Sequence, residues 1–165
     1  MNTFTFFAPI QQEPFNGFMS AVGNVSIAPS EPIKINFASG GGDVDVAFRM
    51  YEYLRGLNRK IIIENYGDVS SSAIIPFLAG DIRLATSYSV FRIHRLACEL
   101  NGPSSLTSLY ERVASLEFDI DRYNKVFCLR TAGAASPIDI LPTLRGAPEI
   151  VMGVDAAIAS GILTK

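Results

Sequence analysis

The chain has 165 residues, of which 48% are hydrophobic and 18% are charged, and its net charge is −2. This length fits one domain, and so apolar a composition excludes a disordered chain. The chain lacks the basic clusters that bind nucleic acid or an anionic membrane, so we expect neither partner. With His94 as its one histidine, a histidine-rich metal site is excluded, and we expect no metal and no cofactor. The apolar surplus indicates either a subunit with an interface or simply an apolar sequence.

The sequence also makes export and membrane insertion poor expectations. The segment Met1–Phe7 has no basic residue, so it does not predict a secretory signal. The longest apolar stretch, Ala73–Ala79, is too short to span a bilayer. Cys98 and Cys128 show no metal or disulfide spacing, and we interpret both as apolar fillers. We therefore expect a cytoplasmic protein.

Two consecutive strand–turn–helix units are predicted in the first half of the chain. The first unit comprises a short strand around Phe4 and Phe6, a short helix within 11–31, a strand at Pro32–Ala38, the turn Ser39–Gly42 and a helix from Val44 to Leu54. The second comprises a strand from Lys60 that ends by Gly67, a turn at Asp68–Ser72, a helix at Ala73–Ala79 and strands at Ile82–Thr86 and Val90–Ile93. Such repetition favours one α/β domain over residues 1–165 with a mostly parallel sheet.

The strongest periodicity lies in residues 104–132, which predict one long helix. Its apolar residues recur in steps of three and four, at Leu106, Leu109, Val113, Leu116, Ile120, Tyr123 and Phe127. The helix is expected to begin near Ser104 or Ser105 and to end at Gly133. The stripe can pack on its own domain or pair with a partner helix, and the length of the helix favours partial projection. A helix at Gly153–Ser160 and a closing strand at Ile162–Thr164 complete the prediction.

Several residues are candidates for chemistry. The turn Ser39–Gly42 precedes a helix, so its backbone N–H groups can hold a phosphate or an oxyanion, or it can be only a tight turn. The serines of the turn Asp68–Ser72 can be helix caps or can expose a nucleophile. His94 is the only imidazole base. The carboxylates that could orient it are Asp139, Glu149 and Asp155.

In order and spacing, these features resemble the proteolytic subunit of the Clp protease, from about Phe6 to the C-terminus. The motifs that carry the resemblance are Ser39-Gly40-Gly41-Gly42, Gly67-x-Val69-x-Ser71-x-Ala73, Leu78-Ala79-Gly80, Val90-Phe91-Arg92-Ile93-His94, the long helix, Thr131-Ala132-Gly133 and Gly161-Ile162. The resemblance implies the superhelical fold that this family shares with the crotonases. It also implies Ser71 as nucleophile, His94 as general base, and the N–H groups of Gly41 and Ser72 as oxyanion hole. The third triad member aligns with Glu149, and Asp139 is the second choice.

The function that this resemblance implies is a serine endopeptidase with a Ser–His–acid triad. It would cut peptides or unfolded proteins inside a self-assembled ring, a heptamer or a stacked double ring, with 104–132 as the oligomerisation helix. An ATP-dependent unfoldase is a possible partner by the same resemblance.

Two alternatives to a ring peptidase stay open. A non-catalytic ring subunit of the same fold is favoured by two departures from the family pattern: Arg95-Leu96 follow the histidine, and Pro148-Glu149 replace an Arg-Asp pair. An enzyme of the crotonase type that acts on an acyl thioester would need the glycine turn but would leave Ser71 and His94 unused.

Overall fold

Strands of alternating burial form one mostly parallel sheet in the computed structural model, which describes residues 1–25, 28, 31–97 and 105–164. The strands are β1 (Asn2–Phe7), β2 (Ile33–Ser39), β3 (Ile61–Ser70), β4 (Ile82–Ala85), β5 (Val90–Ile93) and β6 (Ile150–Met152). Their order is β1-β2-β3-β5-β6, and β4 pairs with β3 beside this path. All pairs are parallel except β5 with β6, which is antiparallel. The predicted α/β class with a mostly parallel sheet is confirmed.

Strand β3 is longer than predicted and divides the sheet. Its first part, Ile62–Asn65, pairs with β4, and its last part, Asp68–Ser70, pairs with β5. The prediction that Gly67 ends the strand and that Asp68–Ser72 is a turn is therefore wrong. Hydrogen bonding to β2 and β5 on both sides keeps the backbone extended through Ser70, so the turn is confined to the residues that follow.

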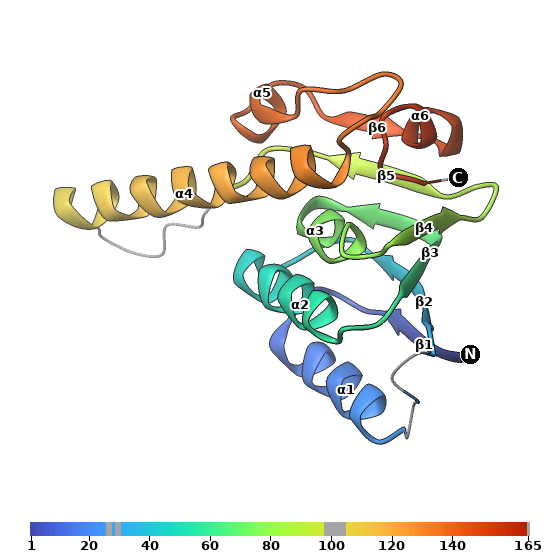
Figure 1. The fold of residues 1–165 in the computed structure, drawn as a ribbon. Helices are drawn as coiled ribbons and strands as arrows, with labels where there is room; N and C mark the ends of the chain where they lie inside the picture. Colours follow the sequence, from blue (N-terminus) through green and yellow to red (C-terminus); the bar gives the residue numbers. More distant parts are fainter. Residues whose placement is uncertain (26–27, 29–30, 98–104, 165) are drawn as a thin grey trace.

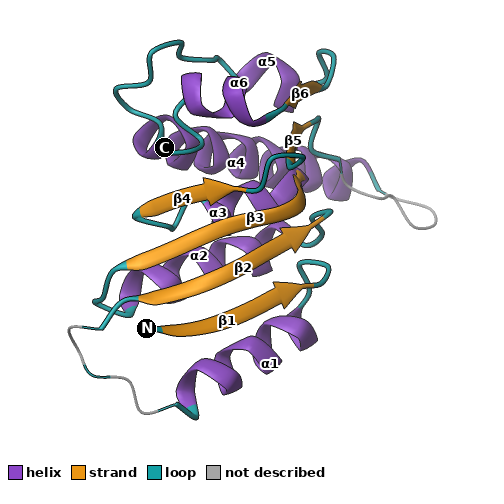
Figure 2. Ribbon diagram, turned by 90° about the vertical axis from the view of Figure 1, so that its right-hand side faces the viewer, coloured by secondary structure: helices purple, strands orange, loops and turns teal. Residues whose placement is uncertain are grey.

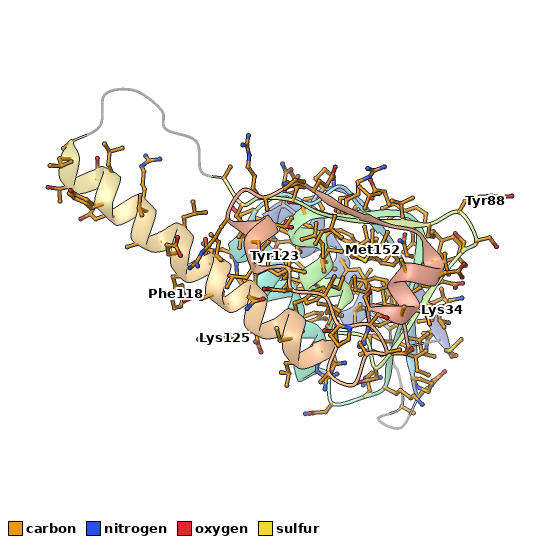
Figure 3. All side chains as sticks on the ribbon, turned by 90° about the horizontal axis from the view of Figure 1, so that it is seen from above. Lys34, Tyr88, Phe118, Tyr123, Lys125 and Met152 are labelled. Atoms are coloured by element: carbon orange, nitrogen blue, oxygen red, sulfur yellow. The ribbon has the colours of Figure 1, made fainter. Side chains whose placement is uncertain are left out.

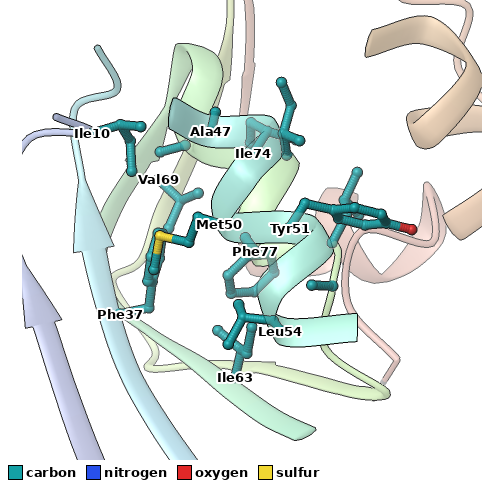
Figure 4. Close-up of a cluster of buried hydrophobic side chains, with 14 of the residues drawn as sticks. Ile10, Phe37, Ala47, Met50, Tyr51, Leu54, Ile63, Val69, Ile74 and Phe77 are labelled. Atoms are coloured by element: carbon teal, nitrogen blue, oxygen red, sulfur yellow. The ribbon is translucent and has the colours of Figure 1, made fainter. Parts of the chain in front are cut away.

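The helices are α1 (Gln12–Gly23), α2 (Val44–Gly56), α3 (Ile74–Phe77), α4 (Leu106–Arg130), α5 (Leu141–Leu144) and α6 (Val154–Ala159), with a 3₁₀ turn, η1 (Ser71–Ala73), before α3. Helices α1, α2 and α3 cover one face of the sheet, and α5 and α6 lie beside β6 at its end (Figures 1 and 2). The predicted helix Ala73–Ala79 is thus a 3₁₀ turn and one short α-helix. Between α2, α3 and the sheet lies a core that includes Phe37, Met50 and Phe77, all fully buried (Figure 4). Each such side chain stabilises the fold by about 1.5–3 kcal/mol.

Helix α4 has 25 residues and begins where the Ser105 hydroxyl accepts a hydrogen bond from the Ser108 N–H, at 3.1 Å. Ser104 lies outside the described residues. Only the second half of the predicted apolar stripe is buried, through Ile120, Tyr123 and Phe127. In the first half of the stripe, Leu106 and Val113 are exposed, whereas Leu109 and Leu116 are half-buried. Tyr110 and Phe118, which lie outside the predicted stripe, are also more than half exposed. The helix therefore projects from the domain, as expected (Figure 3).

The C-terminal region differs from the prediction in three elements. Residues Ile162–Thr164 form no strand, because Gly161 has a φ of +76° and Leu163 donates back to the Ala157 carbonyl of α6. Strand β6 and helix α5 were not predicted. With three and four residues, both are too short to show a period in the sequence.

The cysteine interpretation is wrong for Cys128. This residue is exposed on α4, where its Sγ lies 3.7 Å from Asn124 Oδ1, because that side of the helix faces away from the sheet. Cys98 lies outside the described residues. None of the helices in the described part of the chain has both the length and the apolar character needed to cross a membrane.

Candidate functional site

The predicted site residues meet at the edge of the sheet where the parallel strands end. Gly41 follows β2, Ser71 follows β3 and His94 follows β5. Glu149 precedes β6, which runs antiparallel to β5, so it starts at the same edge. Ligands of open parallel sheets bind outside these carboxyl ends, so the topology alone makes this edge the candidate site.

Ser71 has an unusual backbone. Its φ is +58°, in the left-handed region that residues with a Cβ seldom adopt. Such a conformation costs about 1–3 kcal/mol, and it is found where a site needs a side chain at a sharp turn. The turn connects β3 directly to η1, and Ser71 is half-buried there while Ser72 is fully buried. The Ser72 N–H lies in the first turn of η1, where amides have no intrahelical partner.

The glycine turn after β2 is packed against this serine turn. A Cβ placed on Gly41 would lie 2.6 Å from Ser71 Cβ and 2.8 Å from the Ser70 carbonyl oxygen, and φ of Gly41 is +93°. Only glycine fits so close an approach. The Ser72 hydroxyl accepts from the Gly42 N–H at 2.9 Å and donates to the Gly42 carbonyl at 3.0 Å. These contacts hold the two predicted oxyanion donors, Gly41 and Ser72, on adjoining turns.

The N–H group of Gly41 already has a partner. It donates to the Ser39 hydroxyl at 3.2 Å. An oxyanion would have to share or replace this long hydrogen bond, which is weaker than one at the usual 2.9–3.0 Å.

His94 is half-buried, and its Nδ1 lies 2.9 Å from the carbonyl oxygen of Arg95. That contact favours the tautomer with the proton on Nδ1, because a carbonyl can only accept. The Nε2 lone pair is then available to a proton donor. Among the residues that the structure describes, neither Nε2 nor the Ser71 hydroxyl has a hydrogen-bond partner, so the two are near one edge but not bonded.

The candidate carboxylates occupy different positions. The antiparallel register pairs Ile93 with Ile150, so Glu149 stands opposite His94, one position beyond the last pair. Asp139 instead accepts from the Leu141 N–H at 3.0 Å, and Asp155 lies in the first turn of α6. Within the described ranges, none of the three is hydrogen-bonded to His94. The register between β5 and β6 therefore favours Glu149 over Asp139 as the acid of the predicted triad.

A cleft of about 540 Å³ opens beside the glycine turn. It is lined by Phe7, Ala8, Pro9, Ala38, Ser39, Gly40, Gly41 and Asp68. Asp68 accepts from the Ser70 hydroxyl at 2.5 Å and lies 3.7 Å from the Arg92 guanidinium. Sequence analysis did not identify Phe7 or Asp68, because only the pairing of three strands brings these distant residues to one cleft.

Sequence analysis also missed a contact from α4. The Tyr123 hydroxyl donates to the carbonyl oxygen of Ser71 at 2.9 Å. Complete burial raises the pKa of this tyrosine far above its ordinary value, so the hydroxyl stays protonated. In the sequence, Tyr123 is one more member of an apolar stripe, and nothing in that pattern marks its hydroxyl.

No metal centre accompanies these residues. In the described part of the chain, no three His, Cys, Asp or Glu side chains are grouped closely enough to hold a metal ion.

Comparisons with known proteins identify the fold and the family of the chain. The model of the family described as Clp protease matches residues 6–138. No curated protein matches the chain. A solved structure of a mutant of ClpP1 from Listeria monocytogenes is 17% identical, with a TM-score of 0.79, and the match covers 99% of this chain and 89% of that one. At this identity, the structural match confirms the fold alone. Because the family model matches most of its length, the chain belongs to the Clp protease family.

Proposed function

We propose that this chain is a serine endopeptidase of the Clp proteolytic-subunit type, with Ser71 as nucleophile, His94 as general base and Glu149 as the acid that orients the base. The observation that carries the proposal is the contact of the Gly41 turn with the left-handed Ser71 turn. This contact brings the turn that carries the Gly41 N–H close to the turn that carries the Ser71 hydroxyl and the Ser72 N–H, which supports acyl transfer as the reaction.

In the proposed reaction, Ser71 Oγ forms a bond to the carbonyl carbon of the peptide while His94 Nε2 takes its proton. The N–H groups of Gly41 and Ser72 bind the oxyanion. The C–N bond then breaks, and His94 gives the proton to the leaving amine. Water attacks the acyl-enzyme by the same route and releases the acid and Ser71. The Gly41 N–H exchanges its long bond to Ser39 for the oxyanion in this step.

The proposed reaction needs the side chains of Ser71 and His94 to move together, because they do not share a hydrogen bond in this structure. Catalytic hydrogen bonds are often long without substrate and tighten in the complex. Glu149 stands opposite His94 by register, and its carboxylate would replace the Arg95 carbonyl as the acceptor for Nδ1–H. A carboxylate there also stabilises the imidazolium that forms during attack.

The proposal includes assembly into a homo-oligomeric ring, a heptamer or a stacked double ring, that encloses the sites. The exposed apolar half of α4 supports it, since large apolar patches on a helix face mark interaction surfaces. That half carries Leu106, Tyr110, Val113 and Phe118. Peptides or unfolded proteins are the proposed substrates, and an ATP-dependent unfoldase is the proposed partner.

A second candidate function is a non-catalytic ring subunit of the same fold. The observation in its favour is that each catalytic group has another partner or none. His94 Nδ1 is bound to the Arg95 carbonyl, the Gly41 N–H is bound to Ser39, and the described residues include no partner for the Ser71 hydroxyl.

Labelling with a fluorophosphonate, read by intact mass, separates the two functions. We expect one adduct on the wild type and none on Ser71→Ala. Ser70→Ala is the matched control, since this neighbouring serine is buried and bonded to Asp68, and it should keep the adduct. An assembled wild-type protein that takes up no probe would instead be the non-catalytic subunit.

A further inference from the structure

We propose that Tyr123 is a positioning residue that orients the oxyanion hole. This inference rests on the proposed function and concerns the same site. Tyr123 belongs to α4, 52 residues along the chain from Ser71, and its hydroxyl donates to the Ser71 carbonyl at 2.9 Å. It is the largest of the completely buried side chains, so packing fixes its ring.

The importance of this hydrogen bond follows from the geometry of a peptide unit. The C=O of Ser71 and the N–H of Ser72 belong to one planar trans unit, in which they point in opposite directions. Anchoring the carbonyl on Tyr123 therefore aims the Ser72 N–H away from α4. The Ser72 N–H is one of the two proposed oxyanion donors, so the tyrosine determines its direction without touching the substrate.

The strained backbone of Ser71 explains why an anchor is needed. With φ at +58°, the turn could relax by rotating this peptide unit, which would turn the Ser72 N–H away from the oxyanion. The Ser71 carbonyl has one other partner, the Ile74 N–H, which it shares with the Ser72 carbonyl. The bond from Ile74 moves together with the turn, because Ile74 is a near neighbour in the chain. Tyr123 belongs to a separate element, α4, and can therefore hold the Ser71 carbonyl in place.

The hydroxyl is suited to a constant anchor. Burial raises the pKa of Tyr123 above its ordinary value, so the hydroxyl is a neutral donor at neutral pH. A charged donor in the same place would carry a desolvation penalty, and a phenylalanine would fill the space without the hydrogen bond.

The test is Tyr123→Phe, which removes the hydroxyl and keeps the ring. We expect kcat for a peptide substrate and the rate of fluorophosphonate labelling to fall about 10- to 100-fold, with KM changed less than about two-fold, because the oxyanion exists only in the transition state. Tyr88→Phe is the matched control: the same change at a tyrosine that is 95% exposed and lies outside α4. It should behave as the wild type. An unchanged labelling rate in Tyr123→Phe would overturn the inference.

A second measurement does not depend on activity. Amide hydrogen exchange, read by mass spectrometry on peptides covering 69–78, should be faster in Tyr123→Phe than in the wild type and in Tyr88→Phe, because without the Tyr123 hydrogen bond the Ser71 turn opens more often. Equal exchange in all three proteins would refute the anchor even if no protein labels. If the wild type does not label but still exchanges more slowly over 69–78 than Tyr123→Phe does, the proposed peptidase is refuted and the anchor is supported.

Discussion

The two sides of the candidate site are built differently. On the side of Ser71, the turns of Gly41 and Ser71 approach each other closely, and partly buried hydrogen bonds from the Gly42 N–H and from Tyr123 of α4 hold them. On the base side, His94 is half-buried and bonded to its neighbour's carbonyl, and Glu149 is exposed. The difference teaches that a single chain fixes the turns of Gly41, Ser71 and Ser72 by itself, whereas His94 and Glu149 share no hydrogen bond with each other or with Ser71.

The largest expected effect tests whether the two sides work as one unit. Ser71→Ala and His94→Ala should each lower kcat by roughly 10⁶-fold. The double variant should have no lower kcat than either single variant, because neither residue can carry out the reaction without the other. Peptide hydrolysis by the three variants measures this. Losses that multiply in the double variant would mean that the two residues act independently, and the comparison would fail.

The next effect concerns the acid on the base side. Glu149→Gln should lower kcat by about 10³- to 10⁴-fold, because an amide can neither fix the tautomer of His94 nor balance the imidazolium charge. Asp139→Asn should change kcat little, since Asp139 caps the turn before α5 through Leu141. Kinetics in which Asp139→Asn abolishes hydrolysis and Glu149→Gln is harmless would show that the register between β5 and β6 does not place the triad.

A smaller effect tests the close packing on the side of Ser71. Gly41→Ala should lower kcat about 10²- to 10³-fold and destabilise the fold by about 1–3 kcal/mol, because its Cβ meets Ser71 Cβ at 2.6 Å. Gly40→Ala is the matched control: nothing lies within 4 Å of a Cβ there. Denaturant unfolding and hydrolysis rates check both variants. A Gly41→Ala protein as active and stable as the wild type would contradict the contact.

The smallest expected effect concerns Asp81, which lies at the opposite edge of the sheet from the candidate site. Partial burial alone would raise the pKa of Asp81, but hydrogen bonds from the Ile61 N–H and from Arg55 outweigh it, and the pKa is lowered below its ordinary value. This stabilisation is present above the unfolded pKa, about 3.9, and is lost as pH falls through the lower folded value.

The free energy of unfolding of Asp81→Asn should therefore be lower than that of the wild type by about 1 kcal/mol at pH 7. This gap between the two proteins should shrink as pH falls below about 4 and close below the folded-state pKa. Urea unfolding at several pH values measures the gap, and labelling at pH 7 should be unchanged. A gap that is constant with pH would mean that the carboxylate charge does not matter, and altered labelling would couple the two edges of the sheet.

How far the sequence could predict this protein differs from element to element. Alternation in β1, β2 and β5 and the long period of α4 were enough to place these elements, because their burial pattern repeats over several residues. The alternation of apolar residues does not predict where β3 ends. Gly67 suggests a stop, and only the pairing of Asp68–Ser70 with β5 overrides it.

Three features of the candidate site follow from local sequence: a glycine turn after one strand, a serine turn after the next, and one histidine at the end of a third. The remaining features were decided by tertiary structure. The left-handed φ of Ser71, the approach of Gly41, the place of Glu149 opposite His94 and the anchor from Tyr123 all join segments that are distant in the chain. Sequence patterns report which face of an element is buried, but a hydrogen bond across 52 residues depends on how the elements pack.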